Sequence, residues 1–208
     1  GFEDRPPSDD ELDNMRSLVR QGMEEGALGI GSSLIYAPAF YSSTEELIEL
    51  CKVASEYGGM YISHMRSESN KLLEALDELI TIAEEANIPA EIYHLKAGGV
   101  KNHYKMDLVI NKVNGARAGG LDISADMYTY VAGATGLDAH MPPWVQEGGY
   151  DKWVERLKDS KIRARVKKEM TSDAKNWENL GYHAGPDGVL FAGFRNPDLR
   201  KYIGMTLE

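Results

Sequence analysis

Hydrophobic positions recur along the first 130 residues in two alternating patterns. Apolar residues at helical spacing predict helices over residues 8–25, 43–57, 69–85 and 103–117. Short apolar stretches between them predict strands over residues 27–35, 60–65, 90–95 and 121–128. Such an alternation is typical of a parallel sheet whose strands are joined by right-handed crossover helices.

Several residues predict where these elements begin and end. Ser8 with Glu11, and Ser43 with Glu46, have the spacing of a capping box, in which a hydroxyl and a carboxylate satisfy free N–H groups of the first helical turn. Asn87 is placed to end a helix in the left-handed conformation. Two glycines of the first strand, at 29 and 31, allow another backbone or a ligand to come close.

After residue 130 the pattern changes. A loop with Pro-Pro-Trp covers residues 141–149, a charged helix is predicted over 150–170, and a strand over 188–194. No linker interrupts the chain. We therefore expect one domain (1–208), with βα repeats over 1–130 and a helical insertion with a following strand over 131–208.

The glycine pattern helps to choose between α/β folds. A dinucleotide-binding sheet has a glycine-rich turn between a strand and a helix, but the glycines at 26–31 lie within a strand, and neither GxGxxG nor a Walker motif occurs. Part of a (β/α)8 TIM-type barrel fits better, since side chains at the ends of adjacent strands then meet in one barrel mouth.

Composition narrows the function classes. The formal net charge is −10, which argues against a nucleic-acid partner, because protein surfaces that bind nucleic acids are basic. No apolar run reaches the length that spans a bilayer, so no membrane association is expected. Cys51 is the only cysteine, so no internal disulfide forms, and we expect a reducing, cytoplasmic location. The chain begins at Gly1 without a methionine, and Thr206 resembles the start of a further helix, so we expect an excerpt of a longer protein.

Two segments about thirty residues apart are similar in sequence, YISHMR at 61–66 and EIYHLK at 91–96. This spacing corresponds to one strand plus one helix, so His64 and His94 are predicted to lie at the C-terminal ends of neighbouring parallel strands. Two neutral imidazoles side by side suit zinc. No third ligand is evident from the sequence. Of the other residues that can bind metals, Cys51 is expected to pack in the core, and the remaining histidines are expected to be solvated or to make local hydrogen bonds.

Other side chains near the two histidines are candidates for substrate binding. Lys96 and Arg66 each follow a histidine by two residues and are placed to hold a carboxylate. The alternative for both cations is an ion pair with an acid, such as Glu68 or Asp126. For Asp126, orienting a neighbour is the commonest of several roles. Tyr36 and Tyr128 follow strands and are placed to donate a hydrogen bond to a developing oxyanion.

In the order and spacing of its motifs, the sequence resembles the N-acyl-D-amino-acid deacylases (D-aminoacylases) of the amidohydrolase superfamily. The resemblance covers nearly the whole chain, and it is carried in order by GALGIGSSLIYAP (26–38), YSSTEEL (41–47), SHMR (63–66), HLK (94–96), ADMYTY (125–130) and the Pro-Pro-Trp loop within 137–149. It implies a metal-dependent (β/α)8 barrel that hydrolyses the amide of an N-acyl-D-amino acid. His64 and His94 match the family's zinc ligands of strands five and six. Lys96, Tyr36 and Tyr128 match its substrate-holding lysine and tyrosines.

The resemblance also has departures. The family's His-x-His pair of strand one, its early metal ligand and its strand-eight aspartate, which is the general acid/base, have no counterpart in these residues. A serine that the family often places near the substrate falls on Ala134. The resemblance therefore implies strands four to seven with an insertion, lacking part of the metal site and the catalytic residue.

Two other interpretations remain. A cyclic-amidase relative, such as a dihydroorotase or hydantoinase, usually carries a carbamylated lysine on strand four, where this chain has glycine and serine. A non-catalytic fragment of a barrel exposes two sheet edges, which favour self-association into a homo-oligomer. The partner expected on the hydrolase interpretation is a small N-acyl amino acid.

Overall fold

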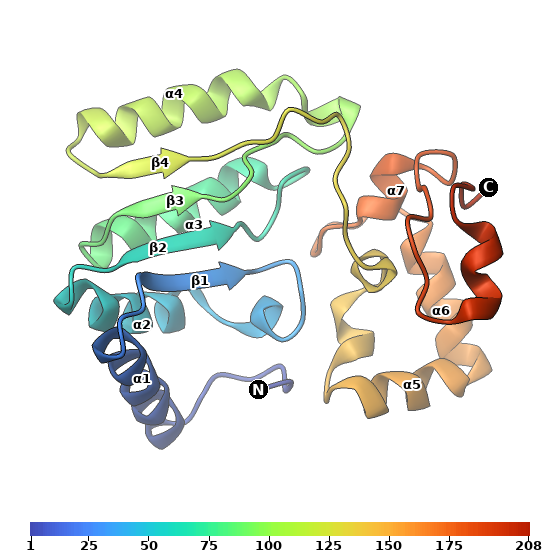
Figure 1. Cartoon of the computed structure of the whole chain (residues 1–208), viewed down its shortest axis with the longest axis horizontal. Helices are drawn as coiled ribbons and strands as arrows, with labels where there is room; N and C mark the ends of the chain where they lie inside the picture. The colour runs from blue at the N-terminus through green and yellow to red at the C-terminus, as the bar shows by residue number, and fades with distance from the viewer.

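The structure, a computed structural model, describes residues 1–208 and is an α/β arrangement around one parallel sheet. The sheet order β1-β2-β3-β4 is the order along the chain. All four strands point the same way (Figure 1). The strands are β1 (Gly29–Ser33), β2 (Met60–His64), β3 (Ala90–Ile92) and β4 (Ile123–Ala125). The helices before and between them are α1 (Asp9–Glu24), α2 (Thr44–Glu56), α3 (Leu72–Glu85) and α4 (Lys105–Ala118).

The predicted helix ends are largely confirmed. The Ser8 hydroxyl accepts a hydrogen bond from the Glu11 N–H, and the Glu11 carboxylate accepts one from the Ser8 N–H, which completes a capping box at α1. At α2 the Ser43 hydroxyl accepts from the Glu46 N–H, but the reciprocal bond is not formed. Asn87 has a φ of 48°, so the predicted left-handed residue after α3 is confirmed.

The two faces of the sheet differ. Ile30, Tyr61, Ala90 and Ile123 pair across the strands and point to one face, where Tyr61 is fully buried. This face contributes to a 21-residue apolar core that includes residues of α2, α3 and α4. The opposite face carries the row Gly31, Ile62, Glu91 and Ser124, and none of these residues is fully buried. Only one face of the sheet therefore faces the apolar core.

At Gly29 the backbone of β1 leaves no room for a side chain against β2. Gly29 has a φ of +153°, and a Cβ there would meet the carbonyl oxygen of Met60 at 1.9 Å. Close approach of another backbone is therefore confirmed at this glycine. At Gly31, a Cβ would make only ordinary contact with Ile62.

The structure corrects two strand ends. β3 and β4 were expected to reach residues 95 and 128, but they end at Ile92 and Ala125. Beyond Ile92 the backbone takes a positive φ at His94, which an extended strand does not allow.

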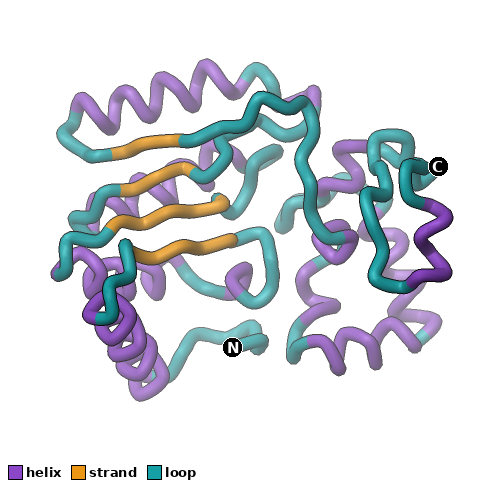
Figure 2. Tube along the Cα trace, in the orientation of Figure 1, coloured by secondary structure: helices purple, strands orange, loops and turns teal.

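The C-terminal part, residues 131–208, consists of short helices and loops (Figure 2). The helix expected over 150–170 is divided at Asp159, whose extended backbone ends one helix and whose carboxylate caps the next. The strand expected over 188–194 is wrong: a single antiparallel bridge joins Leu190 to Thr206, and no other strand lies beside it to form a ladder. The α-helices here are α5 (Tyr150–Lys158), α6 (Ser160–Met170) and α7 (Leu180–Ala184).

The C-terminal part lies beyond the ends toward which the strands point (Figure 1). The Tyr41 hydroxyl donates to the carbonyl of Pro143 at 2.8 Å, and the Asn70 amide donates to Asp173 at 3.0 Å. None of the helices combines the length and the apolar character needed to cross a bilayer.

Candidate functional site

The two predicted histidines meet at the C-terminal ends of neighbouring strands. His64 is the last residue of β2, and His94 follows the end of β3 by two residues. The Nδ1 of His64 lies 3.0 Å from the Nε2 of His94, and the ring centroids are 4.6 Å apart. The expected pairing of the two rings is therefore present in the structure.

The strand register explains how His94 reaches this position. If the similar segments 61–66 and 91–96 were aligned residue by residue, Ser63 would pair with Tyr93. It pairs with Ile92 instead, so the two segments are offset by one residue. In a regular strand His94 would follow Ala90 and Ile92, which are buried on the core-facing side. Instead, His94 has a φ of 37°, a left-handed conformation that is uncommon outside glycine. This turn allows its ring to meet that of His64.

Asp126 supports the turn at His94. Its carboxylate accepts a hydrogen bond from the backbone N–H of His94, and its carbonyl accepts one from Leu95 at 2.8 Å. Asp126 in turn donates its own N–H to the carbonyl of Ile92 at 3.2 Å. The expectation that Asp126 orients a neighbour is confirmed. A strained backbone held by specific bonds is typical of functional sites.

Glu68 is a buried carboxylate beside both rings. Its side chain is only 7% exposed. Its Oε1 lies 3.0 Å from Nδ1 of His94 and 2.5 Å from Nζ of Lys96, and its Oε2 lies 3.6 Å from Nε2 of His64. Burial raises the pKa of the Glu68 carboxyl, while the ammonium of Lys96 opposes the rise. The sequence predicts this residue only as an ion-pair partner of a nearby cation, and the contact with Lys96 agrees with that alternative. Its position in the loop after β2, at the same edge of the sheet as His64, was the available signal.

Burial also sets the charge of His64. It lowers the pKa of the ring to about 3, with His94 and Lys96 acting in the same direction. The imidazole is therefore neutral near pH 7 and has a lone pair free for a metal ion.

Three of the four predicted substrate-binding residues surround the histidines. Lys96 Nζ lies 2.8 Å from Nδ1 of His94 and 5.5 Å from the ring centroid of Tyr128. The ring of Tyr36 packs edge-on against His64 at 5.3 Å, and its hydroxyl lies 2.7 Å from that of Thr135. Tyr128 lies 6.3 Å from His94, ring to ring, and burial raises the pKa of its phenol.

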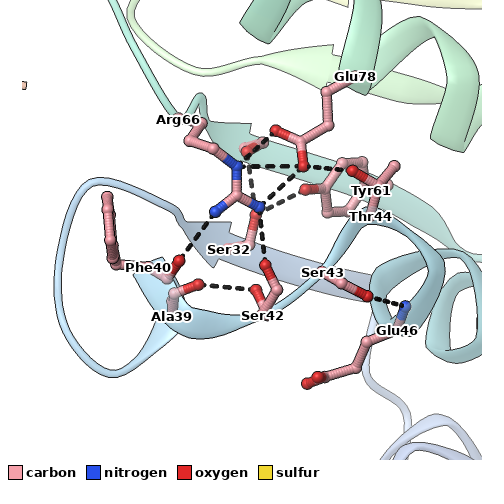
Figure 3. A network of polar contacts seen from close by, with 11 residues as sticks. Ser32, Ala39, Phe40, Ser42, Ser43, Thr44, Glu46, Tyr61, Arg66 and Glu78 are labelled. Atoms are coloured by element: carbon pink, nitrogen blue, oxygen red, sulfur yellow. Dashed lines mark hydrogen bonds and ion pairs between the residues drawn. The ribbon is translucent and has the colours of Figure 1, made fainter. Parts of the chain in front are cut away.

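Arg66 is not brought into this group. Its guanidinium donates to the carboxylate of Glu78 and to the carbonyls of Phe40 and Ser42, joining the end of β2 to α3 and to the loop before α2 (Figure 3). The structure shows the alternative given for this cation, an ion pair, and its role in substrate binding stays a prediction. The acid is Glu78, whose own neighbour is the hydroxyl of Thr44 at 2.8 Å.

The residues present fit a metal ion. Two nitrogens bound to one tetrahedral zinc at about 2.0–2.1 Å lie roughly 3.3 Å apart. The inner nitrogens of His64 and His94, those that face each other, are 3.0 Å apart and need to move by only a few tenths of an ångström. The ligand-type atoms of His64, Glu68 and His94 all lie within 4.8 Å of one another. With a cation and two phenols beside them, these groups are suited to polarising a carbonyl and holding a carboxylate.

Comparison with known proteins agrees with the resemblance. No protein-family model matches the sequence. The chain is 38% identical over 133 residues to the D-aminoacylase of Alcaligenes xylosoxydans xylosoxydans, a match that covers 64% of this chain and 27% of that protein. It therefore spans about a quarter of the length of this relative.

Two solved structures of deacylases are also similar to this chain. A D-aminoacylase, described as defining a novel subset of amidohydrolases, is 36% identical with a TM-score of 0.60, over 62% of this chain and 27% of that chain. An N-acyl-D-glutamate deacylase from Bordetella bronchiseptica, complexed with zinc and a phosphonate mimic of the tetrahedral intermediate, is 26% identical with a TM-score of 0.58, over 60% of this chain and 26% of that chain.

Proposed function

We propose that this chain, which is related to the N-acyl-D-amino-acid deacylases over about three fifths of its length, forms part of a metal-dependent hydrolase that cleaves the amide bond of N-acyl-D-amino acids. One observation carries the proposal. The inner nitrogens of two histidines face each other at the C-terminal ends of adjacent parallel strands, 3.0 Å apart. Parallel α/β folds place their catalytic groups at these ends.

In this proposal the sheet is part of a (β/α)8 barrel, about strands four to seven. The residues of one sheet face are buried in the apolar core, whereas Gly31, Ile62, Glu91 and Ser124 line the other face. In a closed barrel the side chains of such a row point into the interior, which they fill in layers. The open face of this sheet therefore corresponds to the inside of the barrel, and residues 131–208 to an insertion.

The metal is proposed to be zinc, held by Nδ1 of His64 and Nε2 of His94. When bound, zinc polarises the scissile carbonyl and lowers the pKa of a bound water to near neutrality. The zinc-bound N-acyl-D-glutamate deacylase supports this choice. The remaining ligands and the general acid/base are proposed to come from other parts of the whole enzyme, because a catalytic zinc site has at least three protein ligands.

The substrate is proposed to bind across the same edge of the sheet. Lys96 is the cation nearest the histidines, 2.8 Å from His94, and is placed to hold the carboxylate of the amino acid. Tyr36 lies beside the ring of His64 and Tyr128 beside that of His94, and both phenols are proposed to donate hydrogen bonds to the carbonyl oxygen as negative charge develops on it.

Zinc binding tests the proposal. The metal-free chain should take up close to stoichiometric zinc, and His64→Ala should lose most of it, measured by equilibrium dialysis with elemental analysis. His103→Ala, which removes an exposed histidine, is the matched control and should bind like the unmodified chain. Equal zinc in the His64→Ala and unmodified chains would contradict the proposed metal site.

Turnover gives a second test. With zinc and several N-acetyl-D-amino acids, the chain alone should show little or no hydrolysis, because loss of general acid/base catalysis typically costs about 10²–10⁴-fold in rate. A rate near that of an intact deacylase would show that the catalytic acid lies within these residues.

The sheet edges also favour self-association. β1 and β4 are the outer strands, and neither has a neighbour on its outer side. Open edges of this kind pair readily with another chain. We propose that the chain forms homo-oligomers, and a clean monomer by light scattering would contradict this.

A further inference from the structure

A cavity of about 300 Å³ lies between residues 1–130 and the C-terminal part. Residues within 66–78, from the end of β2 to the middle of α3, line it together with residues 174–178, which precede α7. Phe40 and Thr44 complete the lining, close to the ion pair that joins β2 to α3 (Figure 3). Neither of the two histidines lines the cavity. Its volume is at the lower end of the range for small-molecule sites, which begins at about 300 Å³.

The segments that line the cavity are held in place by specific hydrogen bonds. The Asn70 side chain donates to the carboxylate of Asp173 at 3.0 Å, which joins the start of α3 to the segment that follows α6. The fully buried amide of Asn179 donates to backbone carbonyls within residues 169–172 at 2.9–3.2 Å. The cavity is therefore enclosed by ordered segments of both parts of the chain.

Glu178 is a buried carboxylate in this cavity. The residue is only 6% exposed, and its Oε2 accepts a hydrogen bond from the Ser67 hydroxyl at 2.6 Å. Its Oε1 is buried and makes no hydrogen bond. A hydroxyl has one proton, so Ser67 cannot serve both oxygens. Because a buried carboxylate is stable only when it is paired with a cation or bonded to several donors, Oε1 indicates a ligand that supplies a positively charged N–H group.

Two lysines of the cavity are free to bind an anion. Lys71 and Lys175 are exposed, and the ammonium group of neither makes an ion pair or a hydrogen bond. The third cation, Arg66, is already paired with Glu78 at 2.8 Å. A carboxylate bound by the two lysines would stay in contact with water, so its desolvation would cost little.

We propose that this cavity is a binding site for a free amino acid. The ammonium group of the ligand donates to Oε1 of Glu178, and its carboxylate faces Lys71 and Lys175. The partly buried rings of Phe40 and Trp177 lie in the same lining and provide apolar surface for a hydrophobic side chain. One small molecule thus satisfies the buried acid and the two lysines together.

The site distinguishes a free amino acid from its N-acyl derivative. Acylation replaces the ammonium group by a neutral amide, which cannot balance the charge of the buried carboxylate. In the proposed hydrolysis the N-acyl compound is the substrate and the free amino acid is the product. The cavity therefore selects the product class over the substrate class, and this link to turnover alone rests on the proposed function.

Binding also joins the two parts of the chain. Glu178 and Lys175 belong to the C-terminal part, whereas Lys71 is the residue before α3. A ligand held by all three binds only when the parts are together, so it stabilises the closed arrangement by mass action. We expect the amides of α7 to exchange with deuterium about tenfold more slowly at a ligand concentration ten times Kd. Unchanged exchange at saturation would contradict a ligand that bridges the parts.

Isothermal titration calorimetry of the metal-free chain tests the site with D-leucine as the probe. One equivalent should bind saturably. N-acetyl-D-leucine should bind at least about tenfold more weakly, because a hydrogen bond from a charged donor to a buried acid is lost. D-leucinamide, which lacks the carboxylate, should bind about threefold more weakly, because the lysines are exposed. No saturable binding of D-leucine, or equal binding of the N-acetyl compound, would overturn the proposal.

Substitutions locate the site. Glu178→Gln keeps an oxygen for the Ser67 hydroxyl but removes the charge, and should weaken D-leucine binding at least about tenfold. Lys175→Met should weaken it about threefold. Glu85→Gln and Lys168→Met remove exposed charges outside the cavity and should bind like the unmodified chain. If Glu178→Gln does not fold, Lys175→Met and the comparison of D-leucine with its N-acetyl derivative decide the question.

A further variant separates the cavity from the candidate metal site. Lys96→Met should keep the affinity for D-leucine, because Lys96 does not line the cavity. If Lys96→Met loses binding and Glu178→Gln keeps it, the amino acid binds beside the histidines, and the cavity site is wrong while the proposed function stands. If the chain binds no zinc but binds D-leucine through Glu178, the proposed function fails and the cavity site stands.

Discussion

Residues 1–130 and residues 131–208 are held together in different ways. All 21 members of the apolar core lie between Met23 and Ile123. In the C-terminal part the buried apolar residues are few (Ala139, Pro142, Pro143, Val145 and Val166), while many large apolar side chains there are exposed. The first part therefore has a core of its own, and the second does not.

The C-terminal part is attached by polar contacts to the edge of the sheet that carries the candidate site. The hydroxyl of Ser67, the residue before Glu68, donates to the buried carboxylate of Glu178 at 2.6 Å. Regions with few buried apolar contacts open at lower free energy than the core. The site thus lies between a stable sheet and a part that opens more easily, and four predictions test this comparison.

The largest effect is expected in the core of the first part. Leu76→Ala removes a fully buried side chain of α3 and should lower the free energy of unfolding by about 3 kcal/mol. Urea unfolding followed by circular dichroism measures the change. Leu108→Ala, at a half-exposed position of α4, is the control and should change stability by less than about 0.5 kcal/mol. Equal effects at the two positions would show that the first part is not packed as described.

Removing Arg66 should have the next largest effect. Arg66→Met leaves the nearly buried carboxylate of Glu78 without its cation and should cost about 2 kcal/mol, less than a fully buried pair because the guanidinium is partly exposed. Arg16→Met removes a more exposed ion pair with Asp13 and Glu49 and should cost less than about 1 kcal/mol. The same urea experiment compares them, and a smaller loss for Arg66→Met would contradict the structural role assigned to it.

Loss of Glu178 should loosen only the C-terminal part. Glu178→Ala leaves the buried Ser67 hydroxyl without its acceptor, and amides of α7 should exchange with deuterium about tenfold faster, equivalent to about 1.4 kcal/mol. Amides of β2 and β3 should keep their protection. Asp173→Ala, which removes the exposed contact with Asn70, is the control and should have little effect. Faster exchange in the sheet as well would mean that the two parts unfold together.

The smallest effect concerns pH. Burial lowers the pKa of His140, with Asp138 opposing the shift, and the ring lies against Gly181 of α7. At pH values between the pKa of His140 in the unfolded chain, about 6.5, and its lower pKa in the folded chain, the unfolded chain binds more protons. The free energy of unfolding of this part therefore falls as the pH falls, by at most about 1.4 kcal/mol per pH unit. His140→Gln should flatten this dependence in hydrogen exchange of α7, and the exposed His103→Gln should not. An unchanged slope in His140→Gln would assign the dependence to another group.

The fold of the first part was predictable because its signals are local. Helical and strand periodicity, the capping serines and Asn87 each act within a few residues, and the structure places the corresponding elements in the expected order. The strand expected over 188–194 failed because a strand needs a neighbour, and periodicity does not report whether one exists.

The site was predictable in part. The pairing of His64 with His94 followed from their spacing in successive βα units. The left-handed turn at His94 compensates for a register offset of one residue, and register depends on contacts between segments far apart in the chain. The ion pair of Lys96 with Glu68 was one of the stated alternatives, and the structure contains it. The pairing of Arg66 with Glu78 and the approach of Glu68 to both imidazoles were missed, because the packing of α3 and of the loop after β2 decides which groups meet.

The order of the strands has a consequence for biosynthesis. Each strand pairs with the one made immediately before it, so the sheet can grow from one side as the polypeptide leaves the ribosome. No strand of the sheet therefore has to wait for a partner more than one βα unit away along the chain. Both imidazoles are already translated when the ribosome reaches α4, so the pair can assemble before residues 131–208 exist.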